Sequence, residues 1–256
     1  MINKRIVGVV TVRQGWAVQS FGYGRYLPLG KPEVLVENLD RWGADEILLQ
    51  CIDRTTGGLG PDMALLDRIG RRGLSTPLIY GGGIRHAQDA VDCVNAAADR
   101  VTVDALIHDN LDEVSRAGAK LGNQAIIGAL PLSIEGGELR WLQYPTRKVM
   151  PLGTPVIAAL TSGMLSEALV IDWRHEGHAG AFDDKLLDAM PGDFPMIAFG
   201  GIADAVQAGD LLARPRVVAV ASGNFLSYRE HAIQSLKAGL AGHPVRPAHF
   251  GQSIHA

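Results

Sequence analysis

The chain has 256 residues, of which 47% are apolar and 20% are charged, and its formal net charge at pH 7 is −3. This composition is typical of a globular domain, and a slightly acidic chain without a Lys/Arg-rich tract is not expected to bind nucleic acid. Two cysteines are too few for a disulfide framework and indicate a reducing compartment. No apolar stretch reaches the roughly 20 residues of a membrane span, and the first apolar run is too short for a signal peptide. We therefore expect a cytoplasmic protein without a membrane partner.

Short runs rich in Val, Ile and Leu follow one another along the chain, each leading into a turn and then a helical pattern. They lie at residues 5–12, 46–52, 77–81, 100–105, 124–130, 167–172, 195–200 and 216–222. Apolar runs without alternation are typical of parallel strands buried on both faces. Eight strand–helix units in about 250 residues predict an α/β fold, a (β/α)8 TIM barrel, as a single domain. A doubly wound open sheet is the alternative.

An internal repeat supports the barrel. The stretch LIYGGGIRHAQDAVD at 78–92 returns as MIAFGGIADAVQAGD at 196–210, starting 118 residues later. A repeat is a statement about architecture before it is one about chemistry. We predict two half-barrels, at about 1–122 and 123–244, and a C-terminal tail at 245–256.

Glycines at the ends of the predicted strands indicate phosphate binding. The loops after the strands form the catalytic face of a TIM barrel, glycine lets a ligand approach the backbone, and the start of the following helix attracts anions. The predicted phosphate-binding residues are Gly82, Gly83, Gly200, Gly201, Ser222 and Gly223. Two pockets on opposite sides of the mouth would suit a substrate phosphorylated at both ends. The alternative is that these glycines only form tight turns.

The densest titratable group at a strand end is DWRHEGH at 172–178. We interpret it as a source of acid–base chemistry, with a solvated loop as the alternative. The candidates are the carboxylates of Asp53 and Asp172 and the imidazole of His175, with Arg54 or Arg174 facing a phosphate or carboxylate. His175 and His178 are spaced like metal ligands, but no third ligand has suitable spacing, so we expect no metal and no cofactor.

The ordered set of motifs resembles the cyclase subunit of imidazole glycerol phosphate synthase (HisF), an enzyme of histidine biosynthesis. RIVGVVTVRQGWAV, GADEILL, GGGI, ADRVTVDA, LGNQAII and FGGI occur in family order, and residues 134–148 resemble the family's hairpin-like insertion after the fifth strand. The resemblance covers nearly the whole chain. It implies a lyase or amidotransferase-type synthase subunit whose glutaminase partner supplies ammonia at the lower mouth. The phosphorylated substrate would bind at the upper mouth.

The resemblance also implies an ammonia gate. The family closes the lower mouth with a ring of alternating charges at four strand starts. The matching positions here are Arg5, Glu46, Arg100 and Glu167. The third position is Lys in the family, and Arg keeps its charge but not its shape.

The catalytic end departs from the family. Thr11 and Pro131 stand at the positions of its two catalytic aspartates, and neither is a useful base at neutral pH. Asp104 stands where the family has an asparagine beside phosphate, so the second pocket, with Ser222 and Gly223, is the better phosphate site. The first hypothesis is a synthase subunit that uses ammonia on a phosphorylated or nucleotide-linked acceptor, such as a surface sugar. The second is a catalytically silent barrel that binds a phosphorylated metabolite or activates a partner.

Overall fold

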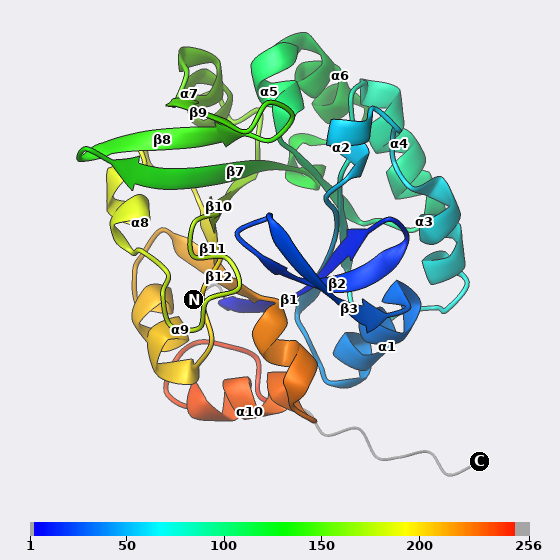
Figure 1. Cartoon of the computed structure of the whole chain (residues 1–256), viewed down its shortest axis with the longest axis vertical. Coiled ribbons are helices and arrows are strands. Elements are labelled where there is room, and N and C mark those ends of the chain that lie inside the picture. Colours follow the sequence, from blue (N-terminus) through cyan, green and yellow to red (C-terminus); the bar gives the residue numbers. More distant parts are fainter. Residues whose placement is uncertain (1–2, 249–256) are drawn as a thin grey trace.

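The computed structural model describes residues 3–248, so most of the tail predicted at 245–256 lies outside the described residues. A closed barrel of parallel strands forms its centre (Figure 1). The barrel strands are β1 (Arg5–Arg13), β4 (Glu46–Cys51), β5 (Leu78–Gly81), β6 (Arg100–Val103), β7 (Ile126–Glu135), β10 (Glu167–Asp172), β11 (Met196–Phe199) and β12 (Val217–Ser222). β1 pairs with both β4 and β12, and the pairing of β7 with β10 completes the ring. The predicted (β/α)8 TIM barrel is confirmed, and each predicted strand is present.

Helices surround the barrel (Figure 1). They are α1 (Pro32–Arg41), α2 (Arg54–Gly57), α3 (Met63–Gly70), α4 (Ala87–Ala96), α5 (Ala105–Asp109), α6 (Leu111–Leu121), α7 (Thr154–Thr161), α8 (Lys185–Ala189), α9 (Ala205–Leu212) and α10 (Ala232–Gly239), with 3-10 turns at Asn123–Ala125 and Asn224–Tyr228. The sequence sets their limits locally; α3, for example, begins where the Asp62 carboxylate accepts the amide of Leu65 at 3.0 Å. None of the described helices is long and apolar enough to cross a membrane.

Two hairpins extend the barrel strands at the upper mouth. β2 (Trp16–Phe21) and β3 (Arg25–Gly30) follow β1, and β8 (Glu138–Gln143) and β9 (Lys148–Pro151) follow β7. Gly136 and Gly137 join β7 to β8 with φ angles of 60° and 82°, which fits the two-residue turn that matches strand twist. The hairpin expected within 134–148 is thus present. The β2–β3 hairpin, which lies across the barrel in Figure 1, was not predicted.

The barrel interior is apolar and is covered by aromatic rings at the top. Its side chains are Val7, Val9, Leu48, Ile79, Ile127, Ala129, Leu169, Ile171, Ile197, Phe199, Ala219 and Ala221. Tyr23 from the β2–β3 turn packs on this cluster, together with Tyr144 and Trp173. The Tyr23 and Tyr144 rings meet edge to face with centroids 5.3 Å apart. The two hairpins and the loop after β10 therefore form the floor of the upper mouth.

Candidate functional site

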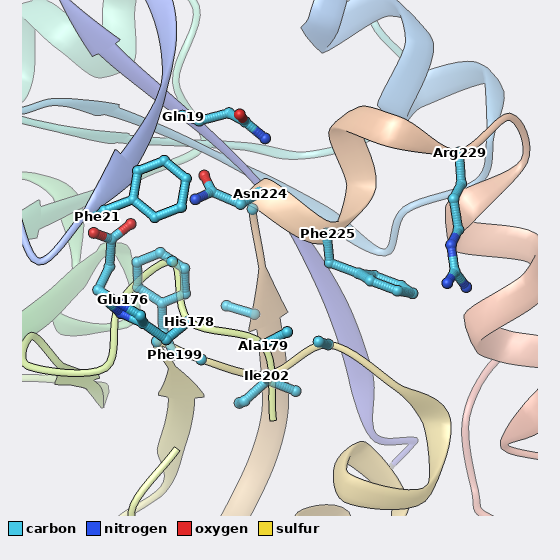
Figure 2. Close-up of a pocket in the computed structure, with 16 residues that line it drawn as sticks. Gln19, Phe21, Glu176, His178, Ala179, Phe199, Ile202, Asn224, Phe225 and Arg229 are labelled. Atoms are coloured by element: carbon cyan, nitrogen blue, oxygen red, sulfur yellow. The ribbon is translucent and has the colours of Figure 1, made fainter. Parts of the chain in front are cut away.

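The larger upper pocket, called here the β11–β12 pocket, has a volume of about 290 Å³ (Figure 2). Gly200, Gly201 and Gly223 form the side contributed by the barrel strands. Phe21 of the β2–β3 hairpin and residues 176–179 form the opposite side. Predicted phosphate-site glycines from two neighbouring strands thus line one pocket.

Glycine is required at positions 200 and 201 for steric reasons. Gly200 has φ +109°, and a Cβ there would lie 2.5 Å from the Asp172 carbonyl oxygen. Gly201 has φ +82°, and its Cβ would lie 2.8 Å from the Phe182 amide nitrogen. Both glycines therefore let the loop after β10 pack on the strand ends, in addition to lining the pocket. The Ser222 hydroxyl is buried and donates to the Ile202 carbonyl at 3.1 Å, so its side chain is directed away from the pocket.

The second pocket, called the β4–β6 pocket, has a volume of about 130 Å³. Gly82 lines it with φ +124°, and a Cβ there would lie 2.2 Å from the Cys51 carbonyl oxygen. The neighbouring Gly83 amide donates to the Thr55 hydroxyl at 3.0 Å. Because β5 and β11 are four strands apart in a ring of eight, the two pockets lie on opposite sides of the mouth. This is the arrangement that the repeat predicts.

The predicted acid–base residues do not line either pocket. Asp172 is buried, and its carboxylate accepts the Asp183 amide at 2.8 Å and contacts His175 Nδ1 at 2.7 Å. It thereby orders the loop after β10 and orients the half-exposed His175 imidazole. Asp53 accepts the Gln14 amide at 2.8 Å and so holds the β1–β2 turn. Within residues 3–248, no three His, Cys, Asp or Glu side chains are grouped as a metal site.

The two arginines suggested as anion ligands have other partners. Arg54 donates to the carbonyl oxygens of Leu59, Gly60 and Pro61 at 2.9, 2.7 and 3.0 Å. It therefore folds the loop between α2 and α3. Arg174 pairs with Glu135 and lies over the Trp173 ring, 4.6 Å from its centroid. Both side chains support loops rather than facing a pocket.

Glu176 is the carboxylate that sequence reasoning did not single out. It lines the β11–β12 pocket, is 3% exposed, and accepts the Ser20 hydroxyl at 2.8 Å. Its backbone carbonyl accepts the Gly22 amide at 2.9 Å, so it also secures the hairpin tip. Burial raises the pKa of Glu176, because the charged form is poorly solvated, although Ser20 and nearby amides oppose the shift. A carboxyl with a raised pKa inside a pocket is a candidate acid–base group.

The positions matching the family's aspartates hold no titratable group. Thr11 is buried on β1, beside Gln50 of β4 in the strand register. Pro131 lies on β7 opposite Ile171. Thr11 follows the interior residue Val9, and Pro131 follows the interior residue Ala129, by two positions, so both side chains face the barrel axis. The Gln50 side chain instead accepts the Tyr23 hydroxyl at 3.2 Å, which makes the top of the interior polar but uncharged there.

The four predicted gate residues form a closed ring at the lower mouth. Arg5 lies 2.9 Å from Glu46 and 2.7 Å from Glu167, and Arg100 lies 3.1 Å from each of the same two carboxylates. Arg100 Nη2 also donates to the Ser166 hydroxyl at 2.9 Å, which leaves its contact with Glu167 an ion pair rather than a well-directed hydrogen bond. Burial alone would lower the pKa of Arg5, but the two carboxylates raise it. Each guanidinium thus lies between two carboxylates.

These features define a class: a TIM barrel with two opposed, glycine-bearing pockets above and a charged ring below. The chain belongs to the histidine biosynthesis protein family, whose model matches residues 5–231. It is 25% identical to the imidazole glycerol phosphate synthase subunit HisF of Exiguobacterium sp., with 93% of each chain covered. It is 26% identical to the HisF subunit of Dehalococcoides mccartyi, with 96% of this chain and 99% of the relative covered.

A Vibrio vulnificus protein, provisionally assigned as the hisF2 subunit of the same synthase, is 24% identical over 93% of this chain and 88% of its own length. The predicted resemblance to the cyclase subunit of this synthase is therefore confirmed. So is the expected enzyme class, since all three relatives are named as subunits of a synthase. The roles of individual side chains remain predictions.

Proposed function

We propose that this chain is a synthase subunit that receives ammonia from a glutaminase at its lower mouth and uses it on an acceptor at its upper mouth. The observation that carries the proposal is the closed ring of Arg5, Glu46, Arg100 and Glu167 beneath an apolar interior. Neutral ammonia can cross an apolar interior, whereas a bare ammonium ion there would be strongly disfavoured. The ring opens only when a charged side chain moves, so a bound partner can control entry.

The surface around the ring suits a docked partner. A concavity of about 470 Å³ lies beside it, lined by Arg5, Arg100, Gln124 and Glu167 among others. A glutaminase seated here would discharge ammonia directly onto the ring. We place the complex in the cytoplasm, because both cysteines are buried free thiols that suit a reducing compartment.

At the upper mouth, the acceptor's phosphate group is assigned to the β11–β12 pocket. Its glycine backbone and the Arg229 side chain supply the means to hold an anion. We assign acid–base work to Glu176, which lines that pocket, and to the His175 imidazole oriented by Asp172. The acceptor is a phosphorylated or nucleotide-linked molecule, for example a precursor of a cell-surface sugar.

The test is reconstitution with a glutaminase. The glutaminase encoded nearest to this gene is co-expressed with the barrel, and we expect the two to co-purify and the barrel to raise the rate of glutamine hydrolysis. Product formation is then compared with glutamine and with ammonium chloride as nitrogen source. A barrel that neither binds the glutaminase nor consumes ammonium would contradict the proposal.

A second candidate function is a catalytically silent barrel that binds a phosphorylated metabolite or activates a partner. The observation in its favour is that Thr11 and Pro131 place no carboxylate on β1 or β7 at the upper mouth. A screen of phosphorylated metabolites by thermal shift, followed by turnover assays on each ligand, separates the two. Stabilisation without turnover in the presence of ammonium would support the silent barrel.

A further inference from the structure

The β4–β6 pocket contains a carboxylate with no ion-pair partner among residues 3–248. Asp104 follows β6 and lines this pocket with Gln50 and Tyr144. Its carboxylate accepts the adjacent amide of Ala105, and it takes part in no ion pair with the residues that the structure describes. Burial raises the pKa of Asp104, since the charged form is poorly solvated there. A phosphate placed beside this group would add a second negative charge in a poorly solvated site.

Two backbone donors next to this pocket already have acceptors within the protein. The Gly83 amide donates to the Thr55 hydroxyl at 3.0 Å, and the Ala105 amide donates to Asp104 itself. Arg147 is the cation that lines the pocket. It donates to the Tyr23 carbonyl at 3.1 Å and lies over the Trp173 ring, 5.9 Å from its centroid. Its guanidinium therefore links the β2–β3 turn to the loop after β10, which leaves fewer of its N–H groups free to bind a ligand.

The remaining polar groups favour a ligand that donates hydrogen bonds. Besides the Asp104 carboxylate, the buried Tyr144 hydroxyl lies in this pocket, close to the Tyr23 hydroxyl. A tyrosine hydroxyl can accept as well as donate. A carboxylate beside it prefers a hydroxyl or an ammonium group to an anion.

The β11–β12 pocket, on the opposite side of the mouth, is lined by a cation. Arg229 lines the β11–β12 pocket and lies over the Phe225 ring, 4.9 Å from its centroid. Within residues 3–248 no carboxylate pairs with it, and Figure 2 shows Arg229 on the opposite side of the pocket from Glu176. A cation beside Gly200, Gly201 and Gly223 is suited to one phosphate group.

We propose that the acceptor carries one phosphate group, held in the β11–β12 pocket, and a hydroxyl- or ammonium-bearing end, held by Asp104 in the β4–β6 pocket. This inference rests on the proposed function, because it describes the acceptor of that same site. It replaces a doubly phosphorylated substrate with a molecule whose two ends differ in charge. A phosphorylated amino sugar is one member of this class.

The test measures binding of three hexose phosphates to the barrel alone by isothermal titration calorimetry. Fructose 6-phosphate, fructose 1,6-bisphosphate and glucosamine 6-phosphate share one phosphate group and differ at the other end. We expect the wild-type barrel to bind the bisphosphate about tenfold more weakly than either monophosphate, which corresponds to about 1.4 kcal/mol. Asp104→Asn should remove that difference and weaken the amino sugar about tenfold. Arg229→Gln should weaken all three.

Asp112→Asn is the matched control, because it removes a nearby carboxylate from the first turn of α6, at an exposed position that neither lines the pocket nor acts on Asp104. Circular dichroism confirms that each variant is folded. The inference is overturned if the bisphosphate binds at least as tightly as fructose 6-phosphate, if Asp104→Asn behaves like Asp112→Asn, or if no probe binds at millimolar concentration. Because neither glutaminase nor ammonia is present, this outcome is independent of the ammonia-transfer test.

Discussion

Removing the Glu167 carboxylate should unbalance the lower ring. In the wild type, Glu167 lies 2.7 Å from Arg5 and 3.1 Å from Arg100. After Glu167→Ala, both guanidinium groups share Glu46 alone, and the ring changes from neutral to a net charge of +1. Two partly buried cations then repel each other across the mouth, and Arg5 Nη2 loses its carboxylate partner, while Arg100 Nη2 keeps only the Ser166 hydroxyl.

The size of the effect follows from burial. Breaking a fully buried ion pair costs about 3–5 kcal/mol, and breaking an exposed one costs about 0–1 kcal/mol. The ring side chains are 8–21% exposed, so we expect a loss of about 2 kcal/mol in the free energy of unfolding. For a domain of this size that lowers the melting temperature by about 4–8 °C. Asp67→Ala, which breaks the exposed pair with Arg71, is the control and should change it by about 1 °C.

Activity distinguishes a gate from a purely structural ring. Assays are run well below the melting temperature of the variant, with glutamine or ammonium chloride as the nitrogen source. If the ring guides ammonia, Glu167→Ala uncouples glutamine hydrolysis from product formation, so glutamine-driven activity falls several-fold while ammonium-driven activity changes much less. Glu167→Gln, which keeps the side-chain length, should show the same selectivity. Equal losses with the two nitrogen sources would refute the channel.

Three further outcomes are expected. The gene should not restore growth to a histidine auxotroph that lacks its own cyclase, because Thr11 and Pro131 replace the family's two acids; growth would mean that other groups perform that chemistry. Since burial raises the pKa of Glu176 in the folded state, its contribution to stability is most favourable in acid and declines as the pH rises through that pKa. The melting temperature of Glu176→Gln relative to wild type should therefore increase with pH, and a constant difference would contradict this. Gly200→Ala should lower stability more than Gly180→Ala, because both have positive φ but only a Cβ at Gly200 would clash, which urea denaturation can measure.

The fold could be predicted because its signal is distributed over the whole chain. Eight apolar runs and a repeated glycine turn are compatible with few arrangements other than a barrel. The β2–β3 hairpin was harder to recognise, because Arg25–Gly30 carries a proline and is largely solvent-facing. Pro28 is tolerated because β3 is an edge strand.

The direction of individual side chains was harder to predict than the fold. In a strand buried on both faces, apolar residues occupy both sides, so the sequence does not show which side faces the barrel axis. Asp172 and Ser222 are therefore correctly placed at strand ends, yet both are directed away from the pockets. Glu176 becomes a pocket residue only because Ser20 and Gly22, more than 150 residues earlier in the chain, pack against it. No local pattern carries that information.

The two ends of the barrel differ in how independently their residues can change. Each ring residue contacts two oppositely charged neighbours, so a single change at the lower mouth leaves partners uncompensated. At the upper mouth, loops carry the chemistry, and their residues can change without disturbing the barrel. A chain with the full charged ring but with Thr11 and Pro131 above therefore fits the proposed ammonia delivery to an altered acceptor. In that proposal, the Asp104 carboxylate makes the β4–β6 pocket the place where the acceptor differs.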